Sequence, residues 1–389
     1  MLSGLRIVEV SSFVAAPTAG LTLAQLGAEV IRIDPPGGAA DVGRWPLAPG
    51  GRSLYWAGLN RGKSSVVSDV RSADGRELLA ALLANDGDAC GGILLSNVNV
   101  PWLSDDVVRG LRSDLVHVQV RGHRDGTPAV DYTVNAATGL PFATGPGGAG
   151  PVSTGPINNA LPAWDLLTGL YSATAVLAGV HRRRATGAGT FATVSLDDVA
   201  ASVLTTLGFL PEAHLSGHSR PPVGNAIYGS FACDMQLADG RAVILVAVTT
   251  RQWADLVRVT GCGAVVDAIA REYGADFADD GTRFEHRELL GAVLRPWFAA
   301  RSLPEVTEAL DSATVLWSPF RTLVEQAREL VTGIAAPVVS LRCDEHIGTT
   351  LASAGPIRRP GEVASEPAAA PQLGQDTDRW ALAVLGRAS

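Results

Sequence analysis

One acidic residue is notable for the position it occupies. Asp165 precedes a run from Leu166 to Val180 that is almost wholly apolar or small, and Pro162 and Trp164 lead into it. This pattern predicts a buried helix with the carboxylate in its first turn, where unpaired N–H groups and a partial positive charge favour an ionised group. An ionised carboxylate that faces outward can act as a nucleophile. The spacing alone favours the simpler role of capping the helix, a common one for aspartate.

The composition describes a folded protein with an ample core. The chain has 389 residues, of which 47% are hydrophobic and 18% charged, so it is long enough for two domains. Its net charge of -8 is spread along the sequence, and no basic run interleaves with aromatic residues, so nucleic acid is not an expected partner. Four widely spaced cysteines and seven histidines without paired spacing predict neither disulfides nor a metal site.

The same features indicate where the protein works. The first residues lack the charged-then-apolar pattern of a signal peptide, and no charge-free run reaches the length that spans a bilayer. The apolar helix after Asp165 comes nearest to that length, but its acidic first turn favours a core helix. We therefore expect a cytoplasmic protein without a membrane partner.

Strand and helix patterns alternate through residues 1–210. The opening reads as a strand from Leu5 to Val10, a helix from Val14 to Leu26 and a strand from Glu29 to Ile33. Further strands are expected at 64–69, 91–95, 115–120 and 190–196, and further helices at 75–84, 166–180 and 197–210. This order predicts a parallel α/β sheet. The turn after the first strand carries no GxGxxG motif, so dinucleotide binding is disfavoured although Asp34 follows the second strand.

The remainder of the chain has a different pattern. Residues 122–160 are rich in Gly, Pro, Thr and Asn and are expected to be irregular, which in a compact chain often marks a functional segment. Residues 211–222 read as a linker to a smaller α+β domain, 223–330. That domain is expected to hold a hairpin, 232–237 and 242–248 with an Asp239-Gly240 turn, and helices near 252–259, 287–300 and 304–310. Residues 331–389 form a C-terminal segment that ends in a helix over 376–385.

Several segments, in their order along the chain, resemble family III CoA-transferases, the CaiB/BaiF family. They are Ser3–Val10, Leu26–Gly37, Asn60–Ser64, Thr186–Thr190 and Pro371–Gly374. The resemblance implies a Rossmann-like, doubly wound large domain that binds CoA, an inserted small domain, and a C-terminal segment that returns to the large domain. It also implies an interlocked homodimer. Asp165 matches the nucleophilic aspartate of the family, so the resemblance favours catalysis over capping for this residue.

The resemblance also restricts the reaction. Racemases of the family carry a His-Asp pair where this chain has Val130 and Asp131, and valine cannot transfer a proton, so racemisation is disfavoured. Asp131 is given a supporting catalytic role, with a loop cap as the alternative. Oxalate-using members carry a glutamine where this chain has Val14, and a glycine run where it has Gly224–Gly229. Both departures weaken an intermolecular transfer of that kind.

Additional motifs resemble a subgroup that moves CoA between the C1 and C4 carboxylates of mesaconate. They are Phe13–Pro17, Arg44–Pro46, Trp56–Lys63, Gly122–Gly126, Val130–Asn135, Gly139–Gly145 and Leu161–Asp165. The resemblance implies an acyl-CoA thioester of a small dicarboxylic acid as substrate and no permanently bound cofactor. Region 330–360 departs from the subgroup. Intermolecular transfer to a free acid and a non-catalytic acyl-CoA binder remain the alternatives.

Charge and hydrogen-bonding capacity then suggest the binding residues. A retained dicarboxylate needs cations or donors, for which the candidates are Arg44, His123 and Tyr132, with the backbone N–H groups of Gly139 to Gly145 for oxyanions. The phosphates of CoA need Lys, Arg or helix N-termini, and the choices are Arg32, Arg61, Lys63, Arg121 and Arg124. For each basic residue, the alternative to ligand binding is a solvated position on the protein surface.

Overall fold

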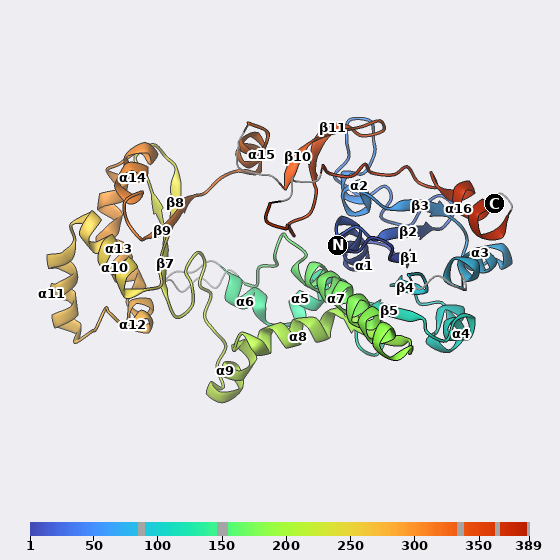
Figure 1. Ribbon diagram of the computed structural model, residues 1–389. Helices are drawn as coiled ribbons and strands as arrows, with labels where there is room; N and C mark the ends of the chain where they lie inside the picture. Colours follow the sequence, from blue (N-terminus) through green and yellow to red (C-terminus); the bar gives the residue numbers. More distant parts are fainter. Residues whose placement is uncertain (85–89, 146–154, 333–337, 362–365, 387–389) are drawn as a thin grey trace. The chain divides into compact units, whose positions relative to one another are not determined.

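The computed structural model describes residues 1–84, 90–145, 155–332, 338–361 and 366–386. The chain divides into two compact units (Figure 1). Unit 1 comprises Met1–Thr138, Asn159–Gly208 and Ala327–Ser389, and unit 2 comprises Gly139–Asn158 and Phe209–Gln326. The described parts of 139–158 thus group with the second unit, although the sequence analysis included them in the first domain.

Unit 1 is built on a six-stranded parallel sheet in the order β3-β2-β1-β4-β5-β6. The strands are β1 (Arg6–Val10), β2 (Glu29–Asp34), β3 (Ser64–Val67), β4 (Ile93–Ser96), β5 (Val116–Arg121) and β6 (Thr190–Ser195). The aliphatic residues of the inner strands β2, β1, β4 and β5 are buried on both faces, as a sheet covered by helices requires, whereas the edge strand β6 is half-exposed. From β1 the chain adds β2 and β3 toward one edge of the sheet, and from β4 it adds β5 and β6 toward the opposite edge. The doubly wound α/β fold is therefore confirmed, with a switch point between β1 and β4.

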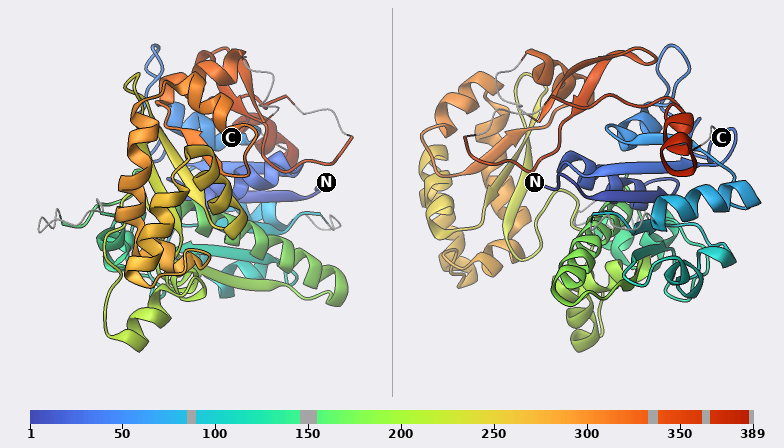
Figure 2. Two further views of the ribbon diagram at one scale, coloured as in Figure 1. Left: turned by 90° about the vertical axis from the view of Figure 1, so that its left-hand side faces the viewer. Right: turned by 45° about the vertical axis from the view of Figure 1, so that its right-hand side comes forward.

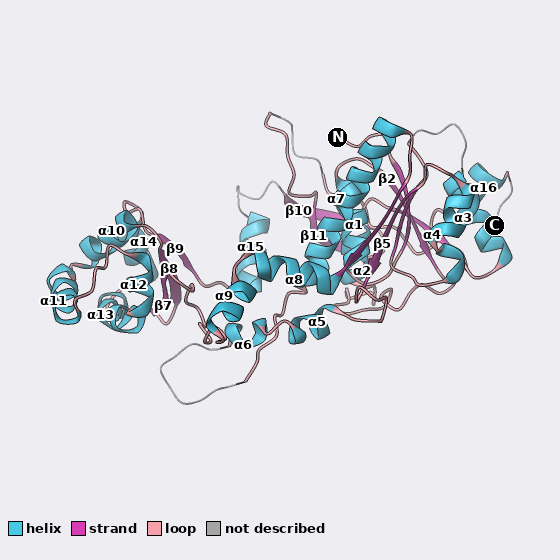
Figure 3. Ribbon diagram, turned by 90° about the horizontal axis from the view of Figure 1, so that it is seen from below, coloured by secondary structure: helices cyan, strands magenta, loops and turns pink. Residues whose placement is uncertain are grey.

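Helices cover both faces of this sheet (Figure 3). Helices α1 (Ala15–Gln25) and α7 (Ala163–Thr186) pack against each other on one face, and α3 (Ala73–Ala84), α4 (Asp105–Leu111) and α16 (Thr377–Leu385) lie on the other. By length and composition α7 could cross a membrane. It packs instead against α1, β5 and β6 inside unit 1, as a core helix does.

Shorter elements complete unit 1. They are α2 (Leu54–Asn60), the 3-10 helix η1 (Pro101–Leu103), α5 (Asp131–Ala137), α8 (Leu196–Thr206) and the antiparallel hairpin β10 (Val339–Asp344) and β11 (Gly348–Ser353). Helix α15 (Leu323–Thr332) crosses the sequence boundary between the two units.

Unit 2 has its own core around a three-stranded antiparallel sheet in the order β7-β8-β9. The strands are β7 (Phe231–Gln236), β8 (Ala242–Ala247) and β9 (Leu316–Pro319). The helices are α6 (Leu140–Thr144), α9 (Phe209–Ser216), α10 (Thr250–Thr260), α11 (Gly263–Tyr273), α12 (Asp280–Glu285), α13 (Arg287–Ala299) and α14 (Leu303–Leu310). Figure 2 shows α10 to α14, in yellow and orange, gathered beside the sheet. Phe231, Trp253 and Phe298 belong to the buried core of this unit.

The structure differs from the sequence expectation where elements are short. Residues 122–160 were expected to be irregular but contain α5 and α6, and the expected linker 211–222 begins inside α9. Helices of five to eight residues carry little periodic signal, because tertiary contacts rather than propensity stabilise them. Residues 333–337 of the departing region 330–360 lie outside the described residues.

Candidate active site

The switch point of unit 1 opens into a cavity of about 790 Å³. Ser12 and Phe13, which follow β1, Asn97, which follows β4, and Gly122, which follows β5, line one wall. Open parallel sheets bind ligands in this position, outside the carboxyl ends of the strands. The remaining wall carries the side chains of chemical interest: Arg44, Tyr55, Arg121, Asp131, Tyr132 and Asp165. The sheet topology thus brings most of the predicted catalytic and substrate residues to one cavity.

Asp131 caps the helix that carries Asp165. The buried Asp131 side chain accepts hydrogen bonds at Oδ2 from the backbone N–H groups of Trp164 (2.7 Å) and Asp165 (3.1 Å). The indole N–H of Trp164 donates to Asn135 Oδ1 at 2.9 Å, which ties α5 to the first turn of α7. Capping is therefore the role of Asp131, and not of Asp165 as the spacing had favoured. The Asp165 carboxyl lines the cavity instead.

The environment raises the pKa of Asp165 to about 7, first because of burial and second because of the negative charge of Asp131. Arg44 acts in the opposite direction. Burial also raises the pKa of Asp131, against the two backbone donors that stabilise its ionised form. The expectation that the helix N-terminus holds Asp165 fully ionised is thus wrong. A carboxyl that titrates near neutrality in a cavity is typical of an active site.

Arg44 lies between two aromatic rings in the wall of the cavity. Its Cζ atom is 5.0 Å from the ring centroid of Tyr55 and 5.8 Å from that of Phe13. Burial raises the pKa of Tyr55 to about 12, so its hydroxyl stays protonated and can donate a hydrogen bond. The Tyr132 hydroxyl donates to Ala160 O at 3.2 Å. The wall therefore offers a cation, Arg44, and a phenolic donor, Tyr55, to an anionic ligand.

The cations after β5 lie at the cavity and on an adjoining open depression. Arg121 lines the cavity, and its guanidinium donates to Gln119 Oε1 (2.7 Å from Nη2). His123 and Arg124 line the depression and pair with Asp197 and Asp198 at the start of α8. Arg121 binds the uncharged Gln119, and Arg124 pairs with the partly exposed Asp198. Both arginines therefore remain accessible to an extended anionic ligand.

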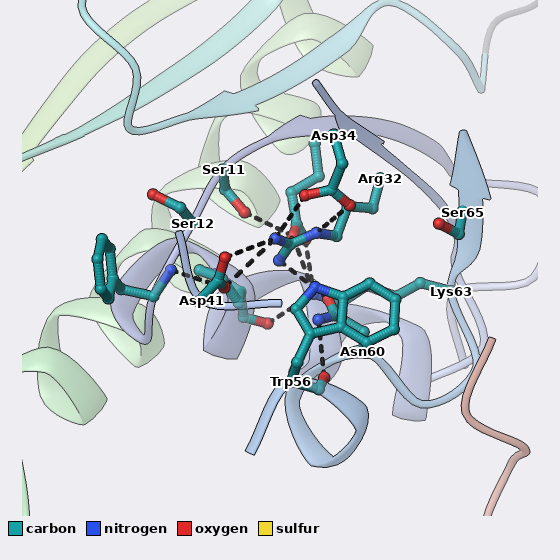
Figure 4. A network of polar contacts seen from close by, with 12 residues as sticks. Ser11, Ser12, Arg32, Asp34, Asp41, Trp56, Asn60, Lys63 and Ser65 are labelled. Carbon is teal, nitrogen blue, oxygen red and sulfur yellow. Dashed lines mark hydrogen bonds and ion pairs between the residues drawn. The ribbon is translucent and has the colours of Figure 1, made fainter. Parts of the chain in front are cut away.

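Three cations predicted to bind CoA have structural roles instead. Arg32 is 0% exposed and donates to Asp34 (2.8 and 2.9 Å) and Asn60 (3.1 Å) (Figure 4). Lys63 is also buried, donates to Glu9 Oε1 and Pro17 O at 2.9 Å each, and has its pKa lowered by burial to about 8. A phosphate cannot reach either side chain.

The third cation, Arg61, forms an ion pair with Asp344 at 2.6 Å, and both residues are buried. It joins the end of β10 to the residue that follows α2, both within unit 1. Asp34, which resembled a ribose-binding acid, is likewise buried on Arg32. Gly139 and Gly145 flank α6 in unit 2, and their role toward oxyanions stays a prediction. Within the described ranges, no group of three or more His, Cys, Asp and Glu residues could hold a metal ion.

Sequence reasoning did not propose Phe13 or Tyr55 as site residues. Phe13 belongs to a motif that was noted as a resemblance, but the sequence carries no sign of its backbone conformation, with φ at 62°. Tyr55 lies in the seven-residue helix α2, which gave no periodic pattern. The fold alone brings both rings to Arg44.

The fold and the site define the class of protein: a Rossmann-like α/β protein with a cavity at the switch point of its sheet, into which helix α7 presents the Asp165 carboxyl. The family model for CoA-transferase family III matches residues 2–377, so the chain belongs to this family and is an enzyme. Among relatives, 2-methylfumaryl-CoA isomerase of Chloroflexus aurantiacus is 40% identical over 389 residues, which cover 99% of this chain and 94% of the relative. Succinyl-CoA:mesaconate CoA-transferase of Haloarcula marismortui is 26% identical over 81% of this chain and 77% of its own.

A solved structure supports the fold. The crystal structure of a CaiB/BaiF family protein from Brucella suis superposes with a TM-score of 0.77 at 23% identity, covering 96% of this chain and 97% of the other. The recognition of the family from its ordered motifs is thus confirmed.

Proposed function

We propose that this enzyme moves CoA between the C1 and C4 carboxylates of mesaconate, the reaction of a 2-methylfumaryl-CoA isomerase. The observation that carries the proposal is the placement of Asp165: its helix is capped by Asp131, and its carboxyl lines the same cavity as Arg44. The site thus offers a nucleophile for a thioester and a cation for a second carboxylate. The 40% identity to the Chloroflexus isomerase supports the choice of substrate.

The proposed reaction has four acyl-transfer steps. The Asp165 carboxylate attacks C1 of mesaconyl-C1-CoA, and the C–S bond breaks to give a mixed anhydride and CoA thiolate. The thiolate attacks the Asp165 carbonyl, which gives an aspartyl-CoA thioester and mesaconate, and the mesaconate stays bound. The C4 carboxylate then attacks this thioester, and the thiolate leaves again. It finally attacks C4 of the second anhydride, which releases mesaconyl-C4-CoA and regenerates Asp165.

Other residues hold the reactants in place. Asp131 is a positioning residue, because it fixes the N–H groups of the first turn from which Asp165 projects. Arg44 binds the carboxylate that is not in the thioester, and the Tyr55 hydroxyl donates a hydrogen bond to it. Tyr132 lines the cavity beside them. Arg121, His123 and Arg124 attract the phosphates of CoA.

Transfer between two molecules is the second candidate. The Haloarcula relative, named as a succinyl-CoA:mesaconate CoA-transferase, favours it, since the same Asp165 chemistry serves a free acid as acceptor. Its 26% identity over 81% of the chain is weaker support than that of the isomerase.

The deciding experiment incubates purified enzyme with mesaconyl-C1-CoA alone and analyses the products by chromatography and mass spectrometry. Conversion to the C4 isomer, with no incorporation of added isotope-labelled free mesaconate, supports intramolecular transfer. A strict need for another acid would move the enzyme to the second candidate. Asp165→Ala should abolish either reaction and the aspartyl-CoA adduct, and activity that survives this change would refute the mechanism.

We also propose that the enzyme is a cytoplasmic, interlocked homodimer, as the family resemblance implies. Light scattering after size exclusion should give twice the 40.3 kDa of the chain. Because interlocked rings cannot separate without unfolding, this mass should persist on dilution to nanomolar concentration. A monomer–dimer equilibrium at native pH would contradict the interlocked arrangement.

A further inference from the structure

Phe13 has a strained backbone at the edge of the cavity. Its φ of 62° is left-handed, and no other non-glycine residue in the described ranges has a positive φ. This conformation costs an aromatic residue about 1–2 kcal/mol and persists only where the surroundings enforce it. The ring is 40% exposed and lines the cavity, so burial of the ring does not explain the strain.

Two side chains hold this turn: Asp41, which is buried, and Asn97, which is half-buried. The Phe13 N–H donates to Asp41 Oδ2 at 2.9 Å, and the Asp41 side chain is 0% exposed and lies 3.4 Å from Arg32. Arg32 is itself fixed by Asp34, so the acceptor of the Phe13 N–H cannot rotate away (Figure 4). On the other side, Asn97 accepts from the Ser12 N–H (3.1 Å) and donates to Ser12 O (2.8 Å).

The same aspartate is linked to Arg44. The Arg44 N–H donates to the backbone oxygen of Asp41 at 3.1 Å, so one residue anchors both the ring and the cation beside it. The guanidinium then lies between the rings of Phe13 and Tyr55. Each cation–π contact is worth about 0.5–1 kcal/mol and restricts a long side chain that is otherwise exposed.

We propose that Phe13 is a specificity-determining residue that holds Arg44 ready for the second carboxylate of the acyl group, and that Asp41 is the positioning residue that acts through it. The inference rests on the proposed function for the identity of Arg44's ligand and deepens it. The strained turn thereby raises the affinity for acyl chains that end in a carboxylate relative to those that end in a methyl group.

The test measures binding without turnover. Two unreactive CoA thioethers serve as probes, 3-carboxypropyl-CoA and butyl-CoA, and calorimetry gives their affinities for wild-type enzyme and for Phe13→Gly. Glycine adopts a left-handed φ without strain, so this variant should fold with unchanged or higher melting temperature. We expect wild type to prefer the carboxylate probe and Phe13→Gly to lose roughly fivefold or more of that preference.

A matched control removes an aromatic ring elsewhere. Phe191→Leu changes a half-exposed phenylalanine on β6 that does not line the cavity, and should leave the preference unchanged. Equal affinity of wild type for the two probes, or an undiminished preference in Phe13→Gly, would overturn the inference.

The role of Asp41 is tested in a double-mutant cycle. Asp41→Ala removes the acceptor of the Phe13 N–H, so it should lower the same preference in the wild-type background and change it little in the Phe13→Gly background, because the ring through which Asp41 acts is then absent. A purely structural role would lower the melting temperature equally in both backgrounds, and independent, additive losses of preference would overturn the positioning role. Since the probes need no turnover, failure of wild type to isomerise mesaconyl-C1-CoA would count against the proposed function alone.

Discussion

Two carboxylates meet at the start of α7, and they have different partners. Asp131 accepts two backbone hydrogen bonds, whereas burial and the neighbouring charge raise the pKa of Asp165 to about 7. A nucleophilic carboxylate must be ionised to attack, yet a raised pKa makes the ionised form more basic and less solvated. The pair therefore places a reactive carboxylate close to its titration point at neutral pH.

This arrangement predicts the pH dependence of the reaction. The value of kcat/KM should rise with pH through about 7, because only ionised Asp165 attacks the thioester. Asp131→Asn keeps an oxygen acceptor but removes the charge that raises the pKa of Asp165, so the rise should move to lower pH. Initial rates at low substrate concentration give kcat/KM, and they should be measured over roughly two pH units on either side of the Asp165 pKa of about 7. Asp69→Asn, at an exposed loop position, is the control, and an unmoved profile in Asp131→Asn would contradict the coupling.

The same pKa has a consequence for stability. Since the folded-state pKa of Asp165 lies above its unfolded value of 3.8, the folded protein binds the proton more tightly, and stability falls as pH rises from about 4 to about 7. Asp165→Asn, which resembles the protonated form, should therefore stabilise the enzyme at pH 8 by on the order of 1 kcal/mol. The gain should vanish near pH 4. Thermal melts at both values measure it, and a destabilised variant at pH 8 would show that the charge is well solvated.

The sequence could predict some of these residues and not others. Asp165 was found because a charge before an apolar helix is visible in the sequence, and the family motif supplied its role. Arg32 and Lys63 were assigned to CoA because a sequence shows a charge but not its partner. Their partners include Glu9 for Lys63 and Asp41 for Arg32, which only the fold brings to them.

At the scale of elements, the close approach of α1 and α7 positions the site. A Cβ atom added to Gly169 would lie 2.7 Å from Ala15 O and 2.7 Å from Thr18 Cβ, so only glycine lets the two helices meet there. The contact lies one turn after Asp165 on α7 and in the first turn of α1, which begins two residues after Phe13. The distance between Asp165 and the strained turn therefore depends on this glycine.

Gly169→Ala should lower both stability and activity. Alanine favours a helix over glycine by about 1 kcal/mol, but the clash with backbone and a packed threonine outweighs this gain, and we expect a net loss of about 1–3 kcal/mol. Gly58→Ala is the matched control, because Gly58 is also helical and a Cβ there meets nothing within 4 Å. It should be neutral or stabilising by up to about 1 kcal/mol. Denaturant unfolding and kcat measure both, and equal behaviour of the variants would refute the packing argument.

Element prediction succeeded where periodicity was long. The six strands of the sheet and the helices α1, α3 and α7 were all expected from apolar runs and glycine ends. The short helices α2, α5 and α6 were missed. They nevertheless supply Tyr55 and Asp131, so the irregular-looking segments contribute much of the chemistry.

At the scale of the whole molecule, the end of the chain completes the core that its beginning builds. Trp380 and Ala381 of α16 belong to the same buried cluster as Val8, Ile31 and Leu79. The backbone N–H groups of Ser65 and Val67 on β3 donate to the side chains of Asp376 and Thr377 at 2.9 Å each. The core of unit 1 therefore includes α16, which follows unit 2 in the sequence.

Trp380→Ala should consequently destabilise unit 1 even though it lies outside the described cavity lining. Trp380 is 6% exposed in the core, and loss of a buried tryptophan costs about 3–5 kcal/mol. Leu382→Ala is the matched control on the same helix, since Leu382 is 61% exposed and its loss should change stability by no more than about 0.5 kcal/mol.

Because unit 2 has a separate core around Phe231 and Trp253, Trp380→Ala should unfold in two steps, with activity lost in the first and part of the far-ultraviolet circular dichroism retained until the second. A single transition in Trp380→Ala, with activity and ellipticity lost together, would mean instead that the two cores are coupled and unfold as one.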